Sequence, residues 1–145
     1  MSDSEAPYTI LYADDDPDFR MLAQCALEDS RLPIDLRFAE DGEEVMDYLR
    51  EEGKFRWTLC PSPDLILLDL NISKKDGLEV IQEIQQDYKF RHIPVVVLTT
   101  SGVQEEIYRS YEIQVNAFVS KPLTADCLHA VLHALNDGEG PDGDG

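Results

Sequence analysis

Polar side chains follow short apolar runs at four places in the chain, and their types together suit phosphoryl chemistry. The residues are Asp14 and Asp15 after Tyr8–Ala13, Asp69 after Leu65–Leu68, Thr99 after Val95–Leu98, and Lys121 after Phe118–Ser120. Carboxylates that lie close together disfavour joint ionisation unless a cation shares them. An all-oxygen cluster with room for water suits Mg²⁺, and Mn²⁺ can substitute for it. With an ammonium and a hydroxyl nearby, such a cluster can hold a phosphoryl group on one carboxylate.

Asp69 is the strongest candidate for the phosphorylated carboxylate. It closes a run of four aliphatic residues, where a charge is otherwise costly. Asp16 has a structural interpretation instead, as a helix N-cap with Pro17 at the first helical position. A lone Lys-Pro pair or a lone Thr carries little weight. The occurrence of all these residues in this order therefore indicates the site.

The apolar runs also predict the fold. Short continuous runs bounded by turn residues are typical of strands buried on both faces of a parallel sheet. The predicted strands are residues 9–13, 34–39, 65–69, 94–99 and 117–119, with 34–39 at an edge because it alternates apolar and polar residues. Helical stretches between them indicate a doubly wound α/β domain. Ligands bind beyond the carboxyl ends of such strands, so the site residues should meet at one edge.

Apolar stripes predict which helical residues cover the sheet. The expected inward residues are Phe19, Leu22, Ala23, Ala26 and Leu27; Val45, Met46 and Leu49 in a helix over about 42–51; Leu78, Ile81, Ile84 and Tyr88; and Ala125, Leu128, Val131, Leu132 and Leu135. Ser101 and Gln104 predict a capping box that opens a short helix through Tyr111. Residues 53–63 form a long connection, a feature that is often functional.

Length and charge limit the function. The 145 residues suffice for one domain, predicted over 8–136, between a flexible N-terminus (1–7) and a disordered acidic tail (137–145). A net charge of −18, from 30 acidic and 12 basic residues, argues against binding to nucleic acid or anionic membranes. Residues 1–7 do not resemble a signal peptide, and no apolar run approaches the roughly 20 residues of a membrane span. We therefore expect a cytoplasmic protein.

Cysteine and histidine spacing gives no strong metal or disulfide signal. The three cysteines Cys25, Cys60 and Cys127 are far apart and include no C-x-x-C pair, which favours reduced thiols. His129 and His133 are four residues apart, with Asp126 as the nearest third ligand. A solvated helix face is the preferred interpretation of that pair over a metal site.

Five segments of the chain have the pattern of one known family: YADDDPD (12–18), PDLILLDLN (63–71), KDGLEVI (75–81), IPVVVLTTS (93–101) and NAFVSKP (116–122). On these segments the chain resembles, from about Thr9 to Leu135, the CheY-like receiver domain of bacterial response regulators. The resemblance implies a five-stranded parallel sheet of the flavodoxin type, with strand order 2-1-3-4-5. Two positions depart from the family pattern: Ser73 stands where proline is usual, and Asp16 stands where Asn is common.

The resemblance also implies roles for individual residues. Asp69 becomes the phosphoryl acceptor. The implied Mg²⁺ ligands are Asp15, Asp69 and the backbone carbonyl of Asn71, with Asp14 acting mainly through water. The implied phosphoryl contacts are Thr99 and Lys121, and Phe118 takes the position of the switch aromatic.

These roles predict a single-domain response regulator of a two-component phosphorelay. A sensor histidine kinase supplies the phosphoryl group, and the protein assists its own phosphorylation and dephosphorylation without being an enzyme in the usual sense. No output domain fits after Leu135, so signalling should occur through contact with a downstream protein. The segments from Leu49 to Asn71 and from Thr99 to Pro122 more narrowly resemble regulators paired with bacterial phytochromes.

Two alternatives and one further prediction accompany this interpretation. An Asp-nucleophile phosphatase would need D-x-D, whereas Asn71 stands two residues after Asp69, and a flavodoxin-like electron carrier would need a Ser/Thr/Gly-rich loop after the first strand. A homodimer is predicted through the fourth helix, fifth strand and last helix. The apolar residues behind that prediction are Ile107, Tyr108, Tyr111, Ile113 and Val115, which could instead face the core.

Overall fold

The computed structural model describes residues 8–28, 33–72, 74–111 and 115–138. The predicted flexible N-terminus (1–7) lies outside these residues, as does the predicted acidic tail from residue 139 onward. Residues 137 and 138 belong to the last helix, which ends at Gly138. Within the described ranges, no helix is long and apolar enough to cross a membrane.

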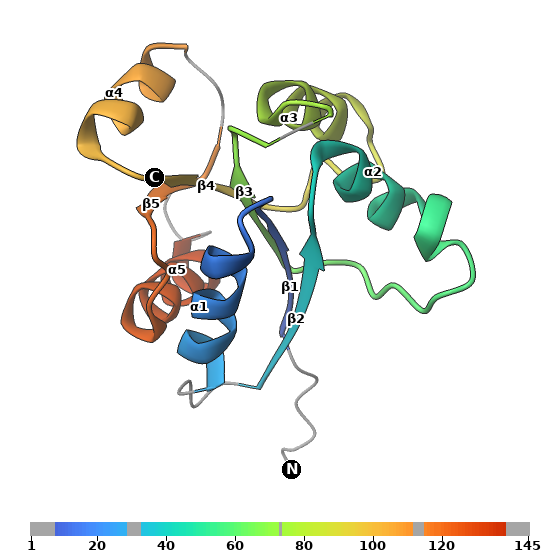
Figure 1. Cartoon of the computed structure of the whole chain (residues 1–145), viewed down its shortest axis with the longest axis horizontal. Coiled ribbons are helices and arrows are strands. Elements are labelled where there is room, and N and C mark those ends of the chain that lie inside the picture. The colour runs from blue at the N-terminus through green and yellow to red at the C-terminus, as the bar shows by residue number, and fades with distance from the viewer. Residues whose placement is uncertain (1–7, 29–32, 73, 112–114, 139–145) are drawn as a thin grey trace.

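Five parallel strands form one sheet in the order β2-β1-β3-β4-β5, which confirms the predicted topology (Figure 1). The strands are β1 (Tyr8–Ala13), β2 (Ile34–Ala39), β3 (Leu65–Asp69), β4 (Val95–Thr99) and β5 (Ala117–Ser120). Every residue of β3 and β4 is buried, as their unbroken aliphatic sequences require. The alternating strand β2 lies at an edge, and five of its six residues are only partly buried.

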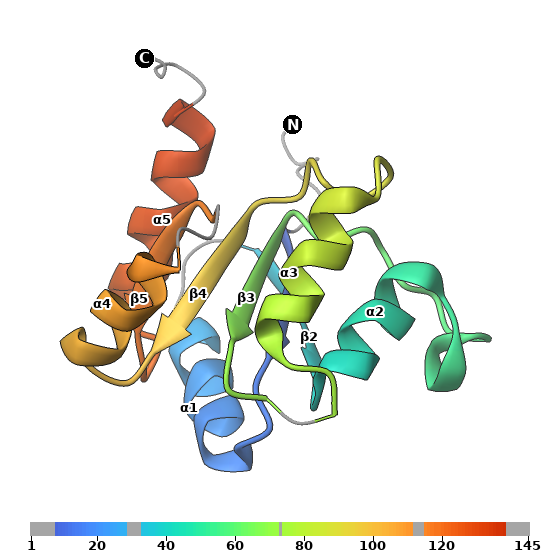
Figure 2. The same ribbon diagram turned by 90° about the horizontal axis from the view of Figure 1, so that it is seen from above.

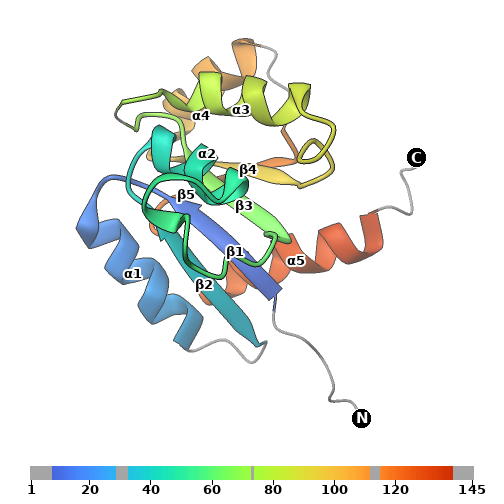
Figure 3. The same cartoon turned by 90° about the vertical axis from the view of Figure 1, so that its right-hand side faces the viewer.

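Helices cover both faces of the sheet, so the domain has three layers (Figure 3). They are α1 (Pro17–Glu28), α2 (Gly42–Arg50), α3 (Gly77–Gln86), α4 (Gly102–Ser110) and α5 (Ala125–Gly138), with a short 3₁₀ turn, η1 (Gly53–Phe55), after α2. Figure 3 shows α1 and α5 on one face and α2, α3 and α4 on the other. Alternate strand residues supply the two cores. Leu11 and Leu68 pack on the α3 side, and Tyr12 and Leu67 pack on the α1 and α5 side.

Side chains cap the N-termini of the helices. In α1 the predicted cap Asp16 accepts from the N–H of Asp18 at 2.9 Å. The carboxylates of Asp41 and Asp76 accept hydrogen bonds from the N–H groups at the third helical positions of α2 and α3. Ser101 does the same for the N–H of Gln104 at 3.1 Å. The reciprocal bond of the predicted capping box is displaced by one residue, because Gln104 Oε1 accepts from the N–H of Thr100 at 2.7 Å.

Two predicted core residues are exposed. Leu22 is 45% exposed because the buried face of α1 is narrow: Ala23 is its fully buried residue, and Leu22 lies about 100° round the helix from it. Tyr88 is 74% exposed because α3 ends at Gln86 and Asp87 is extended, so Tyr88 no longer follows the helical period. In the long connection, Trp57 and Leu59 are 92% and 82% exposed.

Candidate functional site

The carboxyl ends of the parallel strands bring Asp14, Asp69 and Lys121 together. The register aligns Ala13 of β1 with Leu68 of β3, so the next residues, Asp14 and Asp69, leave the sheet at the same level. Figure 2 shows these strand ends at one edge, beside the start of α1. On the other side, the N–H of Lys121 donates to the carbonyl of Thr99 at 2.7 Å and holds Lys121 against the end of β4.

Lys121 joins the two carboxylates. Its Nζ lies 3.0 Å from Asp14 Oδ2 and 2.9 Å from Asp69 Oδ2. All three side chains are shielded from water, with exposures of 5% for Lys121, 0% for Asp14 and 9% for Asp69. Charge-assisted hydrogen bonds in such surroundings are stronger than those at an open surface. The cluster holds two carboxyl groups and one ammonium, so it can accommodate another positive charge when both carboxylates are ionised.

Asp14 is fixed in place by several hydrogen bonds. Its Oδ1 accepts from the N–H of Asp16 at 3.0 Å, and its carbonyl accepts from Arg20 Nη1 at 2.7 Å. Burial raises the pKa of Asp14 above its usual value, although the bonds from Asp16 and Lys121 oppose the change. The pKa of Tyr12, whose hydroxyl is 3.5 Å from Asp14 Oδ2, is also raised by burial and by the nearby carboxylates.

Lys121 keeps its charge in this setting. Burial alone would lower the pKa of Lys121, but the hydrogen bonds to Asp69 and Asp14 outweigh burial, and the pKa is raised. The ring of Phe19 covers a further side of the ammonium, with its centroid 4.2 Å from Nζ. A cation this close to an aromatic face is attracted by the ring quadrupole.

The other predicted metal ligands lie farther out. The side chains of Asp15 and Asn71 are exposed, while the N–H of Asn71 donates to Asp69 Oδ1 at 2.9 Å. Among the described residues, no three or more His, Cys, Asp and Glu side chains gather in a group that could hold a metal, and this includes Asp126, His129 and His133. Two close carboxylates still fit Mg²⁺, which often binds through one or two carboxylates and keeps several waters.

The predicted switch residues occupy two different settings. Thr99 is fully buried, and its hydroxyl lies 3.5 Å from the carbonyl oxygen of Val119. Phe118 is half-buried and packs on the α3-side core. The guanidinium of Arg109 on α4 lies over its ring, 4.5 Å from the centroid, and also pairs with Glu105 at 2.7 Å. The predicted coupling between Thr99 and Phe118 remains a prediction.

Sequence reasoning missed three residues near the site: Phe19, Arg20 and Arg109. Phe19 was expected to face the core, and the basic residues carried no motif. The position of Phe19 and Arg20 in the sequence could have identified them, because both stand in the first turn of the helix that follows the acidic run. First-turn residues of such a helix lie near the strand ends, where the site forms.

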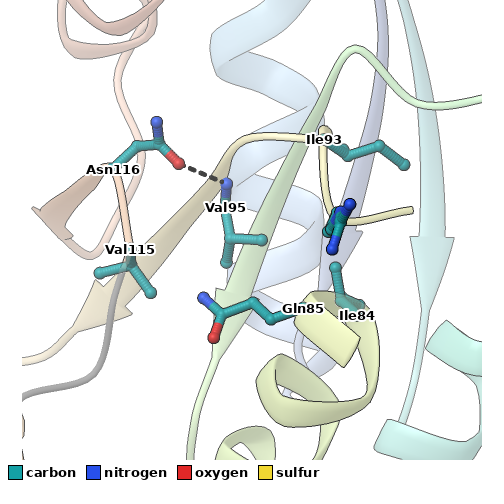
Figure 4. Close-up of a pocket in the computed structure, with 7 residues that line it drawn as sticks. Ile84, Gln85, Ile93, Val95, Val115 and Asn116 are labelled. Carbon is teal, nitrogen blue, oxygen red and sulfur yellow. Dashed lines mark hydrogen bonds between the residues drawn. The ribbon is translucent and has the colours of Figure 1, made fainter. Parts of the chain in front are cut away.

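A cavity of about 420 Å³ lies at the opposite edge of the sheet, away from the carboxylates (Figure 4). Its wall includes Val95, the first residue of β4, and Asn116, whose Oδ1 accepts from the N–H of Val95 at 3.0 Å. A neighbouring cavity of about 500 Å³ shares Arg91, Ile93 and Asn116 with it. Neither is lined by a residue of the predicted site.

Comparison with known proteins agrees with the observed fold. The response regulator receiver domain family matches residues 10–133. Response regulator Rcp1 from Synechocystis sp. is 42% identical over 136 residues, which are 93% of this chain and 91% of Rcp1. The structure of the bacteriophytochrome response regulator AtBRR has a TM-score of 0.83 and 38% identity, with 91% of this chain and 94% of that chain covered.

Two further solved structures bear on metal and phosphate. The phosphorylated cyanobacterial phytochrome response regulator RcpA has a TM-score of 0.70 and 38% identity, with 92% of this chain and 94% of that chain covered. The Mn²⁺-bound form of Rcp1 has a TM-score of 0.70 and 37% identity, with 91% and 93% covered. The family match over residues 10–133 and the 42% identity to Rcp1 set aside the electron-carrier and phosphatase alternatives. The chain belongs to the response regulator receiver family of two-component systems.

Proposed function

We propose that Asp69 of this receiver accepts a phosphoryl group from the phosphohistidine of a sensor histidine kinase. The juxtaposition of Asp69 with Lys121 and the buried Asp14 carries the proposal. A carboxylate oxygen of Asp69 attacks phosphorus, and a P–O bond forms as the P–N bond to histidine breaks. The departing imidazole nitrogen keeps the electron pair and takes up a proton. This transfer depends mainly on positioning and on charge neutralisation.

The surrounding residues have distinct parts in this step. Lys121 neutralises a phosphoryl oxygen with an ammonium that burial and hydrogen bonding already hold beside Asp69. Thr99 supplies a hydroxyl from the end of β4. Asp15, Asp69 and the carbonyl of Asn71 would hold Mg²⁺, with Asp14 acting through water. When bound, the cation would neutralise the charge of the transferring group, and Mn²⁺ bound to Rcp1 supports a divalent ion.

Labelling with acetyl phosphate tests the acceptor. We expect incorporation at Asp69 only with Mg²⁺ or Mn²⁺, none in Asp69→Asn, and weaker metal binding in Asp15→Ala. Asp64→Asn is a matched control, because Asp64 precedes β3 at its other end, where Oδ2 accepts from the N–H of Thr9 at 2.8 Å. The amide retains that acceptor, so labelling should persist. Robust labelling of Asp69→Asn would contradict the proposal.

The proposed phosphodonor is a bacteriophytochrome-type histidine kinase. The similarity to AtBRR and RcpA, both named as phytochrome response regulators, supports this choice. Incubation with an autophosphorylated bacteriophytochrome, and separately with an unrelated histidine kinase, should give rapid transfer only from the first. Equal transfer from both would remove the assignment of the kinase and leave Asp69 as the acceptor.

We also propose that phosphorylation biases the position of Phe118 through Thr99. A hydroxyl drawn toward the phosphoryl group vacates space, which the half-buried ring can fill by turning inward, and the phosphate thereby shifts a population between two packings. Thr99→Ala should accept phosphate yet bind the downstream protein weakly. Binding equal to that of the phosphorylated wild type would show that the two residues are not coupled.

Self-association is proposed through α4, β5 and α5. Ile107 and Tyr111 of the predicted set are 47% and 53% exposed, while Tyr108 and Val115 are half-buried and Ile113 lies outside the described residues. The net charge of −18 opposes pairing, so salt should tighten the dimer. Sedimentation at two salt concentrations, with and without phosphorylation, tests this. A monomer throughout, at tens of micromolar protein, would contradict it.

A further inference from the structure

Phe19 is the one aromatic residue whose ring covers the buried ammonium of Lys121 in the described part of the chain. The distance from Nζ to the ring centroid is 4.2 Å, and only 5% of the Lys121 side chain is exposed. Two sides of the ammonium face the carboxylates of Asp14 and Asp69, and Phe19 closes another. Cation–π attraction is strongest where water is excluded in this way.

The core does not account for the position of Phe19. Its side chain is half-buried, yet within the described ranges it is not one of the half-buried apolar residues that pack against either core cluster. A helical residue that faces the core is buried by contact with side chains of the sheet. The cation contact is therefore the interaction that explains where this ring lies.

The first turn of α1 is anchored to the end of β1, which fixes the ring. Arg20 Nη1 donates to the carbonyl of Asp14 at 2.7 Å, and the N–H of Arg20 donates to the carbonyl of Asp16 at 3.1 Å. The N–H of Asp16 in turn donates to Asp14 Oδ1 at 3.0 Å. These bonds flank Phe19 in sequence and tie its helical turn to the carboxylate that binds Lys121.

We infer that Phe19 is a positioning residue that holds the Lys121 ammonium over the phosphoryl acceptor; this rests on the proposed role of Asp69. The carboxylates that bind Lys121 are also the groups that a divalent cation or a phosphoryl group would engage. The ring of Phe19 is neutral and does not compete for those ligands. It therefore keeps the ammonium in place while the partners of the carboxylates change.

Nuclear magnetic resonance of the metal-free, unphosphorylated protein tests the contact directly. The Lys121 side-chain protons next to the ring should be shifted upfield in the wild type. In Phe19→Leu this shift should disappear, because an apolar side chain without an aromatic ring remains. Phe19→Tyr, which retains the ring, should preserve the shift. An unchanged Lys121 spectrum in Phe19→Leu would overturn the inference.

Labelling rates with acetyl phosphate and Mg²⁺ test the consequence. We expect Phe19→Leu to be labelled about three- to tenfold more slowly, and Phe19→Tyr to be labelled at close to the wild-type rate. Phe90→Leu is the control, because this half-buried phenylalanine packs on the α3-side core. Its labelling should match that of the wild type. A wild-type rate in Phe19→Leu, or an equal loss in Phe19→Tyr, would show that the ring has no positioning role.

The two proposals fail in different ways. If wild-type protein is not labelled on Asp69, the acceptor assignment is wrong, while the spectrum of Lys121 still reports whether Phe19 holds the ammonium. If Asp69 is labelled and Phe19→Leu keeps both the wild-type rate and the wild-type spectrum, only the role of Phe19 is wrong.

Discussion

Replacing Lys121 with methionine tests how strongly the buried cluster depends on its ammonium. Methionine keeps an unbranched stem next to the ring of Phe19 but removes the charge. Two bonds are lost, of 3.0 Å to Asp14 and 2.9 Å to Asp69, and each bond to a charged group contributes roughly 1.5–3 kcal/mol. Breaking a buried ion pair from one side costs about 3–5 kcal/mol.

The lower end of the range of about 3–5 kcal/mol applies here, because each carboxylate can be stabilised in another way when the ammonium is removed. Asp14 already has a raised pKa and can take up a proton, and Asp69 retains the N–H of Asn71 at 2.9 Å. We therefore expect Lys121→Met to lose about 3 kcal/mol of unfolding free energy near neutral pH without metal. For a urea slope of about 1.5 kcal/mol/M, the unfolding midpoint falls by roughly 2 M.

The pH dependence of this loss has a definite sign. A raised pKa at Asp14 means that the folded protein binds the proton more readily than the unfolded chain. Stability from this group is fully present below its unfolded pKa and is lost as pH rises through its folded pKa. In Lys121→Met the ammonium no longer lowers the pKa of Asp14, so Asp14 takes up a proton at a higher pH than in the wild type. The loss of unfolding free energy relative to wild type should therefore become smaller as pH falls toward about 5.

Urea unfolding of wild type, Lys121→Met and the control Lys89→Met, each with and without Mg²⁺, decides the matter. Lys89 is exposed, so its substitution should leave the midpoint within about 0.3 M of wild type. Added Mg²⁺ should stabilise Lys121→Met more than wild type, because a cation replaces the missing ammonium. A metal-free midpoint for Lys121→Met equal to that of wild type would refute the reasoning that the ammonium compensates two buried carboxylates.

Two other substitutions have definite expected outcomes. Asp14→Asn should raise the metal-free unfolding free energy by about 1 kcal/mol at neutral pH. It removes a carboxylate whose pKa is raised by burial, while Oδ1 can still accept from the N–H of Asp16. Urea unfolding with and without Mg²⁺ measures this gain in stability and the expected loss of the response to metal. Gly77→Ala should destabilise the domain by up to about 3 kcal/mol, because the new Cβ would lie 2.4 Å from Leu70 Cα. A thermal unfolding midpoint equal to that of the wild type would show that the backbone around Leu70 moves to accept the Cβ without cost.

The sheet could be predicted from sequence because its strands are buried on both faces. The runs at Leu65–Asp69 and Val95–Thr99 have no polar alternation, and both strands are buried throughout. Helical faces were harder to predict. Leu22 follows the apolar period of α1, yet it is exposed. A hydrophobic stripe in the sequence does not show how much of the helix surface contacts the sheet. Tyr88 was counted in α3 because no residue in the sequence marks the end at Gln86.

The site could be predicted as a set of residue types, but the arrangement of neighbouring acids could not. Asp14 and Asp15 follow the same strand, and successive residues point to opposite sides. In a sheet with both faces covered, apolar pattern does not reveal which acid turns inward. The N–H of Asp14 continues the β1–β2 ladder by donating to the carbonyl of Ala39 at 3.2 Å. Asp14 is consequently buried beside Lys121, and Asp15 is exposed.

Phe19 shows a second limit of the same kind. Helical periodicity gives the direction of a side chain round the helix axis, but not its height along the axis relative to the sheet. Ala23, one turn later on the same face, lies over the strands and is fully buried in the core. Phe19 stands in the first turn, beside the strand ends, and meets the ammonium of Lys121 instead. An aromatic residue can stand in the first turn of a helix that follows an acidic run at a strand end. Such a residue either packs in the core or covers the site, and its position along the helix axis decides which.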